Sequence, residues 1–492
     1  MKMKKIIIAI ATVLLAQMLP AQESDAVYKL LRQEWTVNND GTSDYHYRHE
    51  VQILRNRALT AYADKGETFV VYNPDLEELT VNEVYTVRPD GSRVEMPQNA
   101  FVYQLPSECA DCGRFNHFRE LAMVHTGMEL GCTVVVDYTI HRRFDLVNQT
   151  LCLVKDCPVE QMEINVTLPD NQELNVKLND PALFAFKPEV AQTAHRYSLK
   201  VRNLPGRYTD SYLPRTEALY PMLHFFNGIP EFVPAFDENG LPEAARATGK
   251  AMSGTGSREN LVLLRNYVID NIHLNDIAPE MLGYKHSTAA EVWQSGCGTA
   301  TDKAVLLAAI LNQWGYRARV VGDQSDEVAV VLDTLEYRMG MRQKSPLTLY
   351  GEAKDEVRTF TANSTEEATL DTLEDGFFQV VLPGVPGGPN VSASRLALTR
   401  TAPVQSAACN LKSDLTLTLP KGVKLVGPKV DEQLSFEGVG SVKVSIKQSG
   451  SKLKVVRNLQ LEESVVPANH YEQYRRLLTV WQGVENVLVR KK

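Results

Sequence analysis

The chain has 492 residues, of which 44% are hydrophobic and 23% are charged, and its formal net charge is −8. This length exceeds what one hydrophobic core ordinarily organises, so we expect a globular protein of two or three domains. The acidic balance and the lack of a basic run argue against nucleic-acid binding, which needs clustered Lys and Arg. The sequence contains neither a P-loop nor a dinucleotide-binding glycine motif, and we expect no cofactor.

The first 22 residues differ from the rest. Lys2, Lys4 and Lys5 precede an apolar run, residues 6–15, and Pro20-Ala21-Gln22 follows it. This pattern predicts a secretory signal peptide over residues 1–22, and we expect no transmembrane segment in the mature chain. The protein is therefore expected in the periplasm, associated with the outer membrane, or secreted.

Residues 23–206 are predicted to be rich in β-structure. Alternating apolar residues favour half-buried strands, which we expect at residues 69–72, 79–87, 132–140, 162–168 and 197–201. An antiparallel β-sandwich is the simplest arrangement for such strands.

Four of the seven cysteines form close pairs in sequence: Cys109 with Cys112, and Cys152 with Cys157. Each pair is a candidate disulfide in an exported chain. A zinc site that also uses His117, His125 and Cys132 is an alternative with no recurring ligand spacing, and a thioredoxin-like role lacks the surrounding βαβ pattern.

Helical periodicity begins after a Pro-punctuated linker. Leu261, Leu264, Val268 and Ile272 line one face of a predicted helix. Two histidines, His273 and His286, follow it, and a solvated or capping role is expected for both.

Residues 293–321 predict a loop, a helix and a strand. Thr299 and Asp302 form a capping pair, small and apolar residues then recur at helical spacing, and Gly315 provides a left-handed stop before a strand at residues 318–321.

The last region, residues 372–492, is predicted to form a small β domain. Strands are expected around residues 415–419, 442–446 and 453–456, and a closing helix after Pro467 that ends at Gly483. The aromatic stripe of that helix, which we expect to be core, contains Tyr471, Tyr474 and Trp481.

The segment from Gly298 to Leu307 resembles the core motif of exported bacterial transglutaminase-like proteins, which have a papain-like fold. Members usually read Gly-Asp-Cys-Lys-Asp-Lys-Ala, and Gly298, Asp302 and Lys303 match this motif. The nucleophilic Cys then falls on Ala300, and the triad His falls on Glu327. The resemblance therefore implies a degenerate catalytic site, with Cys297 as the fallback nucleophile.

The resemblance also implies the domain plan of an α+β protein. An N-terminal β-sandwich of unknown function (23–206) would precede a transglutaminase-like domain (207–371) and a C-terminal β domain with a closing helix (372–492). Val87-Arg88-Pro89-Asp90-Gly91 and Leu130-Gly131-Cys132 stand at the matching places of the N-terminal domain.

Three functional hypotheses follow. The first is a non-catalytic transglutaminase-like protein that binds a peptide, glycan or envelope protein, or serves as a scaffold, at the first turn of the helix that begins near Ala300. The second is a peptidase or acyltransferase that uses Cys297 with His273 or His286. The third is a structural component of the cell envelope. The missing nucleophile favours the first hypothesis over an enzyme, and the second hypothesis stays open.

Overall fold

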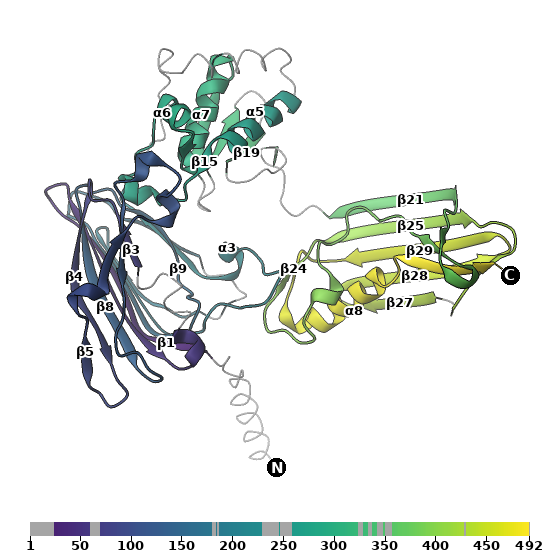
Figure 1. Cartoon of the computed structure of the whole chain (residues 1–492), viewed down its shortest axis with the longest axis horizontal. Coiled ribbons are helices and arrows are strands. Elements are labelled where there is room, and N and C mark those ends of the chain that lie inside the picture. Colours follow the sequence, from purple (N-terminus) through teal and green to yellow (C-terminus); the bar gives the residue numbers. More distant parts are fainter. Residues whose placement is uncertain are drawn as a thin grey trace. The chain divides into compact units, whose positions relative to one another are not determined.

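The computed structural model describes residues 24–59, 69–179, 184, 186–228, 246, 258–322, 328–332, 337–341, 348–349, 357–427 and 430–491 (Figure 1). The predicted signal peptide lies outside these residues. The chain divides into two compact units. The first comprises Met1–Asp180, Phe184–Arg207 and Tyr220–Gly351, and the second comprises Pro181–Leu183, Tyr208–Leu219 and Glu352–Lys492.

An eight-stranded sheet dominates the first unit. The central strand β1 pairs in parallel with β10 and antiparallel with β2, and the other pairings are antiparallel. In spatial order the strands are β12 (Glu189–Gln192), β13 (Arg196–Leu204), β10 (Val159–Thr167), β1 (Ala26–Val37), β2 (Ser43–Ile53), β8 (Thr133–Arg142), β4 (Glu77–Val87) and β5 (Arg93–Glu95).

The predicted strand β8 is present, but burial does not alternate along it, because Val135 and Asp137 on the opposite face are buried as well. Val134 and Val136 are fully buried and Ile140 is nearly so, whereas Tyr138 on the same face is half-buried. A turn at residues 88–91 follows β4, since the Gly91 N–H donates to the Arg88 carbonyl and Gly91 has a φ of +84°. The N-terminal region is therefore a β domain, as the alternating pattern predicts.

Two three-stranded sheets complete this β domain. One consists of β11 (Asn175–Asn179), β14 (Met222–Phe226) and β9 (Asn148–Cys152), and it packs on the large sheet where the Phe225 ring lies 5.0 Å from that of Trp35. The other consists of β3 (Phe69–Tyr72), β7 (Arg119–Met123) and β6 (Phe101–Gln104). Short 3-10 turns precede and follow β6, at Gln98–Ala100, Ser107–Cys109 and Gly113–Phe115.

Helix α7 (Ala300–Gln313) lies at the centre of the helical part of the first unit, and its residues from Ala300 to Leu311 are all buried. Helices α5 (Arg258–Asn271) and α6 (Ala289–Ser295) pack with it (Figure 1). An antiparallel sheet packs against the same helix and consists of β17 (Ala318–Gly322), β18 (Val328–Leu332), β19 (Tyr337–Gly340) and β20 (Thr348–Leu349). The predicted helix, its Thr299 cap and the strand after Gly315 are confirmed.

The described residues of the second unit form two main sheets and one long helix. The first sheet consists of β21 (Arg358–Glu367), β25 (Cys409–Thr418), β29 (Lys452–Leu461), β28 (Gly440–Ser449) and β27 (Val430–Phe436). The second consists of β22 (Asp371–Thr372), β23 (Phe377–Val381), β31 (Asn486–Lys491) and β26 (Val423–Leu425). A bridge joins β24 (Val404–Gln405) to β30 (Val465–Val466), and α3 (Thr216–Leu219) also belongs to this unit.

The closing helix α8 (Tyr471–Gln482) packs on β28 and β29. Tyr474 is fully buried, Tyr471 is nearly so, and Trp481 is half-buried against the same hydrophobic cluster. The prediction that this aromatic stripe is core is confirmed.

Candidate functional site

The first turn of α7 is fixed by a reciprocal cap. The Thr299 hydroxyl accepts a hydrogen bond from the Asp302 N–H at 3.2 Å, and the Asp302 carboxylate accepts one from the Thr299 N–H at 2.9 Å. This capping box satisfies two backbone groups that a helix start otherwise leaves without partners. Ala300 is therefore the first residue of the helix, at the position where the resemblance implies a nucleophile.

Asp302 also joins two segments of the site. Its carboxylate is fully buried, and it accepts a second hydrogen bond from the Ser287 N–H at 2.7 Å, just before α6. Gly298 is required beside it, because a Cβ on residue 298 would lie 2.8 Å from the Asp302 Cβ. Gly298 and Asp302 are therefore both needed for the local structure.

Lys303, the third motif residue, supports the preceding helix. Its ammonium donates to the carbonyls of Ile269 and Ile272, at 3.2 and 2.8 Å, where α5 ends. A cation at a helix C-terminus satisfies carbonyls that lack partners and complements the helix dipole. Burial lowers the pKa of Lys303, and the charge of Asp270 opposes that effect in part.

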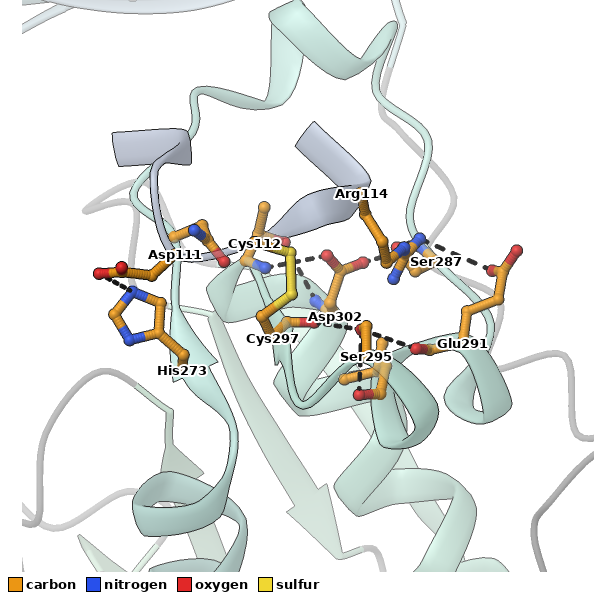
Figure 2. The surroundings of a disulfide bond; sticks show 12 residues. Asp111, Cys112, Arg114, His273, Ser287, Glu291, Ser295, Cys297 and Asp302 are labelled. Atoms are coloured by element: carbon orange, nitrogen blue, oxygen red, sulfur yellow. Dashed lines mark hydrogen bonds and ion pairs between the residues drawn. A yellow bond between two sulfur atoms is a disulfide. The ribbon is translucent and has the colours of Figure 1, made fainter. Parts of the chain in front are cut away.

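The sulfur of Cys297 is committed to a disulfide with Cys112, across 185 residues of sequence, with a Cα–Cα distance of 5.9 Å (Figure 2). The expectation that Cys109 pairs with Cys112 is therefore wrong, and Cys152 and Cys157 are not bonded to each other. The pairing depends on two loops that meet only in the folded chain. Cys297 has no thiol available as a nucleophile while this bond is intact.

The bridge fastens the loop of residues 107–118 to the start of α7. The Asn275 side-chain amide donates to the Glu108 carbonyl at 2.8 Å, and Arg114 donates to the Ser287 hydroxyl at 2.6 Å. Figure 2 shows the Arg114 contact on one side of the disulfide and, on the other, the His273 ring, whose Nε2 lies 3.9 Å from the Asp111 carboxylate. Ala300 and Cys297 are only 7% and 2% exposed, so neither side chain is accessible to a ligand in this state.

The two histidines that precede α7 differ in their relation to Cys297. His273 lies in β15 (His273–Leu274), which pairs in parallel with β16 (Cys297–Gly298) and places His273 opposite Cys297. His286 contacts the Ser287 carbonyl at 3.0 Å. The expected position of the triad His, Glu327, lies outside the described residues.

Metal binding receives no support in the part of the chain that the structure describes, where no cluster of three or more His, Cys, Asp or Glu side chains has the arrangement of metal ligands. The alternative zinc set also loses Cys112, whose sulfur is bonded to Cys297. Among the described residues, no helix is both long and apolar enough to cross a membrane.

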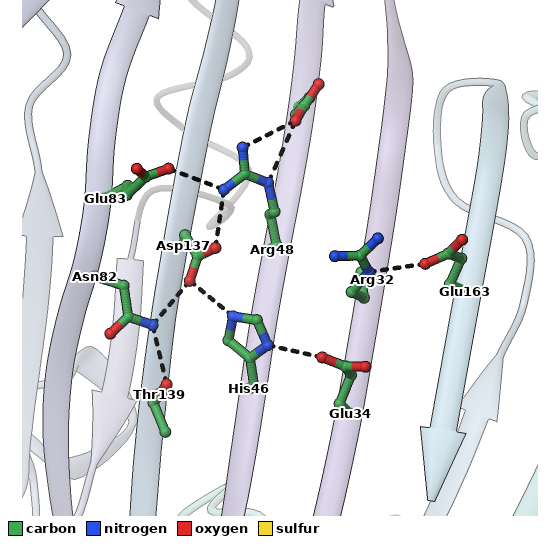
Figure 3. A network of polar contacts seen from close by, with 10 residues as sticks. Arg32, Glu34, His46, Arg48, Asn82, Glu83, Asp137, Thr139 and Glu163 are labelled. Carbon is green, nitrogen blue, oxygen red and sulfur yellow. Dashed lines mark hydrogen bonds and ion pairs between the residues drawn. The ribbon is translucent and has the colours of Figure 1, made fainter. Parts of the chain in front are cut away.

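A second polar cluster, which sequence patterns did not reveal, lies on one face of the eight-stranded sheet (Figure 3). His46 contacts Glu34 at 2.9 Å and Asp137 at 2.8 Å, and Arg48 donates to Asp137 and Glu83, both at 3.0 Å. Burial alone would lower the pKa of His46, but its hydrogen bonds to the two carboxylates outweigh that effect and raise the pKa. The only sequence signal was charge on alternate residues of β2.

Two family models match parts of the chain. Residues 39–208 match a domain of unknown function with a solved structure (DUF3857), and residues 389–487 match a second such domain (DUF3858). No curated protein matches the chain.

Solved structures extend these matches. A crystal structure described as a "putative protease" from Parabacteroides distasonis is 23% identical, with a TM-score of 0.73 over 95% of this chain and 99% of that chain. A mutant M1 zinc metallopeptidase from Deinococcus radiodurans is 10% identical over 41% of this chain and 42% of that chain, and its TM-score of 0.18 carries no argument. The chain shares the fold of the Parabacteroides structure, and the matches together fit a multidomain bacterial protein.

Proposed function

We propose that this chain is a non-catalytic transglutaminase-like protein of the cell envelope, which acts as a binding or scaffold module. The observation that carries the proposal is Ala300 at the first residue of α7. A papain-like enzyme needs a thiol there, because the helix N-terminus and a neighbouring His together favour the thiolate. A methyl group at this position cannot attack a carbonyl.

The local architecture supports the transglutaminase-like assignment. The buried helix α7 is followed directly by antiparallel strands β17, β18 and β19, the order in which the family carries its nucleophile helix and its His strand. Gly298, Asp302 and Lys303 occupy the motif positions and fix the loop and both helices around the missing nucleophile.

An exported location is supported by two features. Residues 1–22 have the charge and apolar pattern of a signal peptide. A buried disulfide between distant residues, Cys112 and Cys297, is typical of a protein that folds in an oxidising compartment.

One observation favours a second candidate, a Cys-dependent peptidase or acyltransferase. His273 lies opposite Cys297 in the β15–β16 pair, and the Asp111 carboxylate lies 3.9 Å from the His273 ring. Nucleophile, base and orienting carboxylate would then come from three separate segments. This candidate requires that the Cys112–Cys297 bond be broken, so that Cys297 carries a free thiol.

The two candidates are separated by assaying amide hydrolysis and amine incorporation on a fluorogenic peptide library, with and without a thiol reductant. For a non-catalytic protein we expect no turnover above that of the Cys297→Ala variant in either condition. Ala300→Cys alone should also be inactive, because a correctly placed base is needed as well. Reductant-dependent turnover that Cys297→Ala and His273→Ala both abolish would refute the proposal.

A binding role can be tested by co-sedimentation of the oxidised chain with isolated cell-wall sacculi, with the conservative Ala300→Ser as a control for small changes at the buried helix start. We expect retention that does not change when Cys297 is replaced, since binding needs no nucleophile. If the chain does not co-sediment with sacculi and shows reductant-dependent turnover, the result would favour the Cys-dependent enzyme.

A further inference from the structure

Three cysteines, rather than two, meet beside the start of α7. Cys109, Cys112 and Cys297 share one buried cluster with Phe115, Phe118 and Ile277. Cys109 is a thiol with 1% exposure, and it is the third sulfur of a group whose other two are already bonded. A buried thiol next to a disulfide is the arrangement that thiol–disulfide exchange requires.

The backbone allows Cys109 and Cys112 to bond to each other. The Cys112 N–H donates to the Cys109 carbonyl at 3.2 Å, which closes a turn between them. The ends of such a turn lie within about 7 Å of each other. A disulfide spans Cα–Cα distances of about 4.4–6.8 Å, so the turn can accept the bond with small local adjustment.

We propose that these cysteines form a thiol–disulfide exchange site, in which Cys109 displaces Cys297 from Cys112. The Cys109 thiolate attacks the Cys112 Sγ, the Cys109–Cys112 bond forms, and the Cys112–Cys297 bond breaks. Cys297 leaves as a thiolate and takes up the proton that Cys109 lost, through solvent. The step is an isomerisation, so it consumes no oxidant and no reductant.

The exchange changes what holds the loop of residues 107–118 in place. In the state described here the loop is covalently tied to the strand before α7, and the Cys297 side chain is not accessible to a ligand. After exchange only the non-covalent contacts remain, chiefly Asn275 with Glu108 and Arg114 with Ser287. The free Cys297 thiol then lies on the strand beside His273. This inference is independent of the proposed function, because it concerns the sulfurs and not turnover.

The surroundings of Cys109 make the exchange slow at neutral pH. Burial raises the pKa of the Cys109 thiol to about 11, and the charge of Glu108 adds to the effect. Only the thiolate attacks a disulfide. At pH values below that pKa, the exchange rate should therefore rise about tenfold for each unit by which the pH increases. The present pairing is thus kinetically protected until the loop opens or the pH rises.

The test uses the full oxidised chain, purified without reductant and incubated with iodoacetamide between pH 7 and pH 9. Non-reducing peptide mapping by mass spectrometry then follows two products, alkylated Cys297 and the Cys109–Cys112 peptide. We expect both to appear at the same rate, with about a tenfold increase per pH unit. Because this experiment uses the wild-type chain, it tests the exchange even if a cysteine variant fails to fold.

Variants sharpen the result. Cys109→Ser and Cys109→Ala should reduce Cys297 alkylation at least about tenfold at pH 9, because no internal thiol remains to displace it. Cys132→Ala is the matched control, since Cys132 is a buried thiol of the same unit outside the cluster. Persistence of the Cys112–Cys297 peptide through pH 9, or equal Cys297 alkylation with and without Cys109, would overturn the proposal.

Discussion

Removing the Cys112–Cys297 bond should destabilise the first unit without unfolding it. The bond closes a loop of 185 residues, for which the chain-entropy relation gives about 5 kcal/mol at 25 °C. Native disulfides more often contribute about 2–4 kcal/mol, because the unfolded chain retains some structure. The Asn275–Glu108 and Arg114–Ser287 hydrogen bonds keep the loop docked when the bond is absent. We therefore expect Cys112→Ser and Cys297→Ser each to lose about 2–5 kcal/mol.

Urea unfolding followed by tryptophan fluorescence measures this loss, because Trp35, Trp293 and Trp314 all lie in the first unit. The double variant should lose no more than either single variant to within about 1 kcal/mol, since all three delete the same bond. Cys152→Ala, which removes a half-buried thiol of the same unit, serves as the control. Midpoints that match the wild type in both single variants would refute the assignment of the bond as a structural crosslink.

Three further outcomes are expected. Asp302→Ala should lower the free energy of unfolding by roughly 2–4 kcal/mol, because the Ser287 and Thr299 N–H groups lose a buried acceptor, and an unchanged urea midpoint would contradict this. Gly298→Ala should lower the free energy of unfolding by about 1–3 kcal/mol, because its Cβ would press against Asp302. Ala300→Ser should lower it by less than about 1 kcal/mol, and equal losses in the two variants would contradict the steric argument. Because the pKa of His46 is raised in the folded chain, protonated His46 stabilises the fold fully below about pH 6.5, and this stabilisation is lost as the pH rises through the folded-state pKa. The difference in melting temperature between wild type and His46→Gln should therefore shrink from pH 6 to pH 8.5. A constant difference would exclude a charged His46.

Local features of the fold were predictable from sequence, and contacts between distant segments were not. The start of α7 could be located because Thr299 and Asp302 are three residues apart and their interaction is local. The Cys112–Cys297 pairing could not, because sequence proximity favours Cys109 as the partner of Cys112. For the same reason no local pattern indicates that β1 pairs in parallel with β10.

The contacts of the candidate site could not be predicted from the sequence. The assignment of Gly298, Asp302 and Lys303 to a family motif stays a prediction, and their contacts are visible only in the folded chain. Cys297 was expected to be a spare thiol, and its sulfur is instead bonded to Cys112. The role of Glu327 stays a prediction.

Under the proposed assignment, the contacts of Gly298, Asp302 and Lys303 explain why these residues would be retained in a chain without the nucleophile. Gly298 makes room for Asp302, Asp302 joins two loops, and Lys303 caps α5, so the fold depends on each of them. The side chain at position 300 has no such structural role, because Thr299 caps the helix and Ala, which follows it, is the residue that favours a helix most. An Ala at position 300 is therefore compatible with an intact helix start, and the proposed assignment needs no thiol there to account for the contacts of Gly298, Asp302 and Lys303.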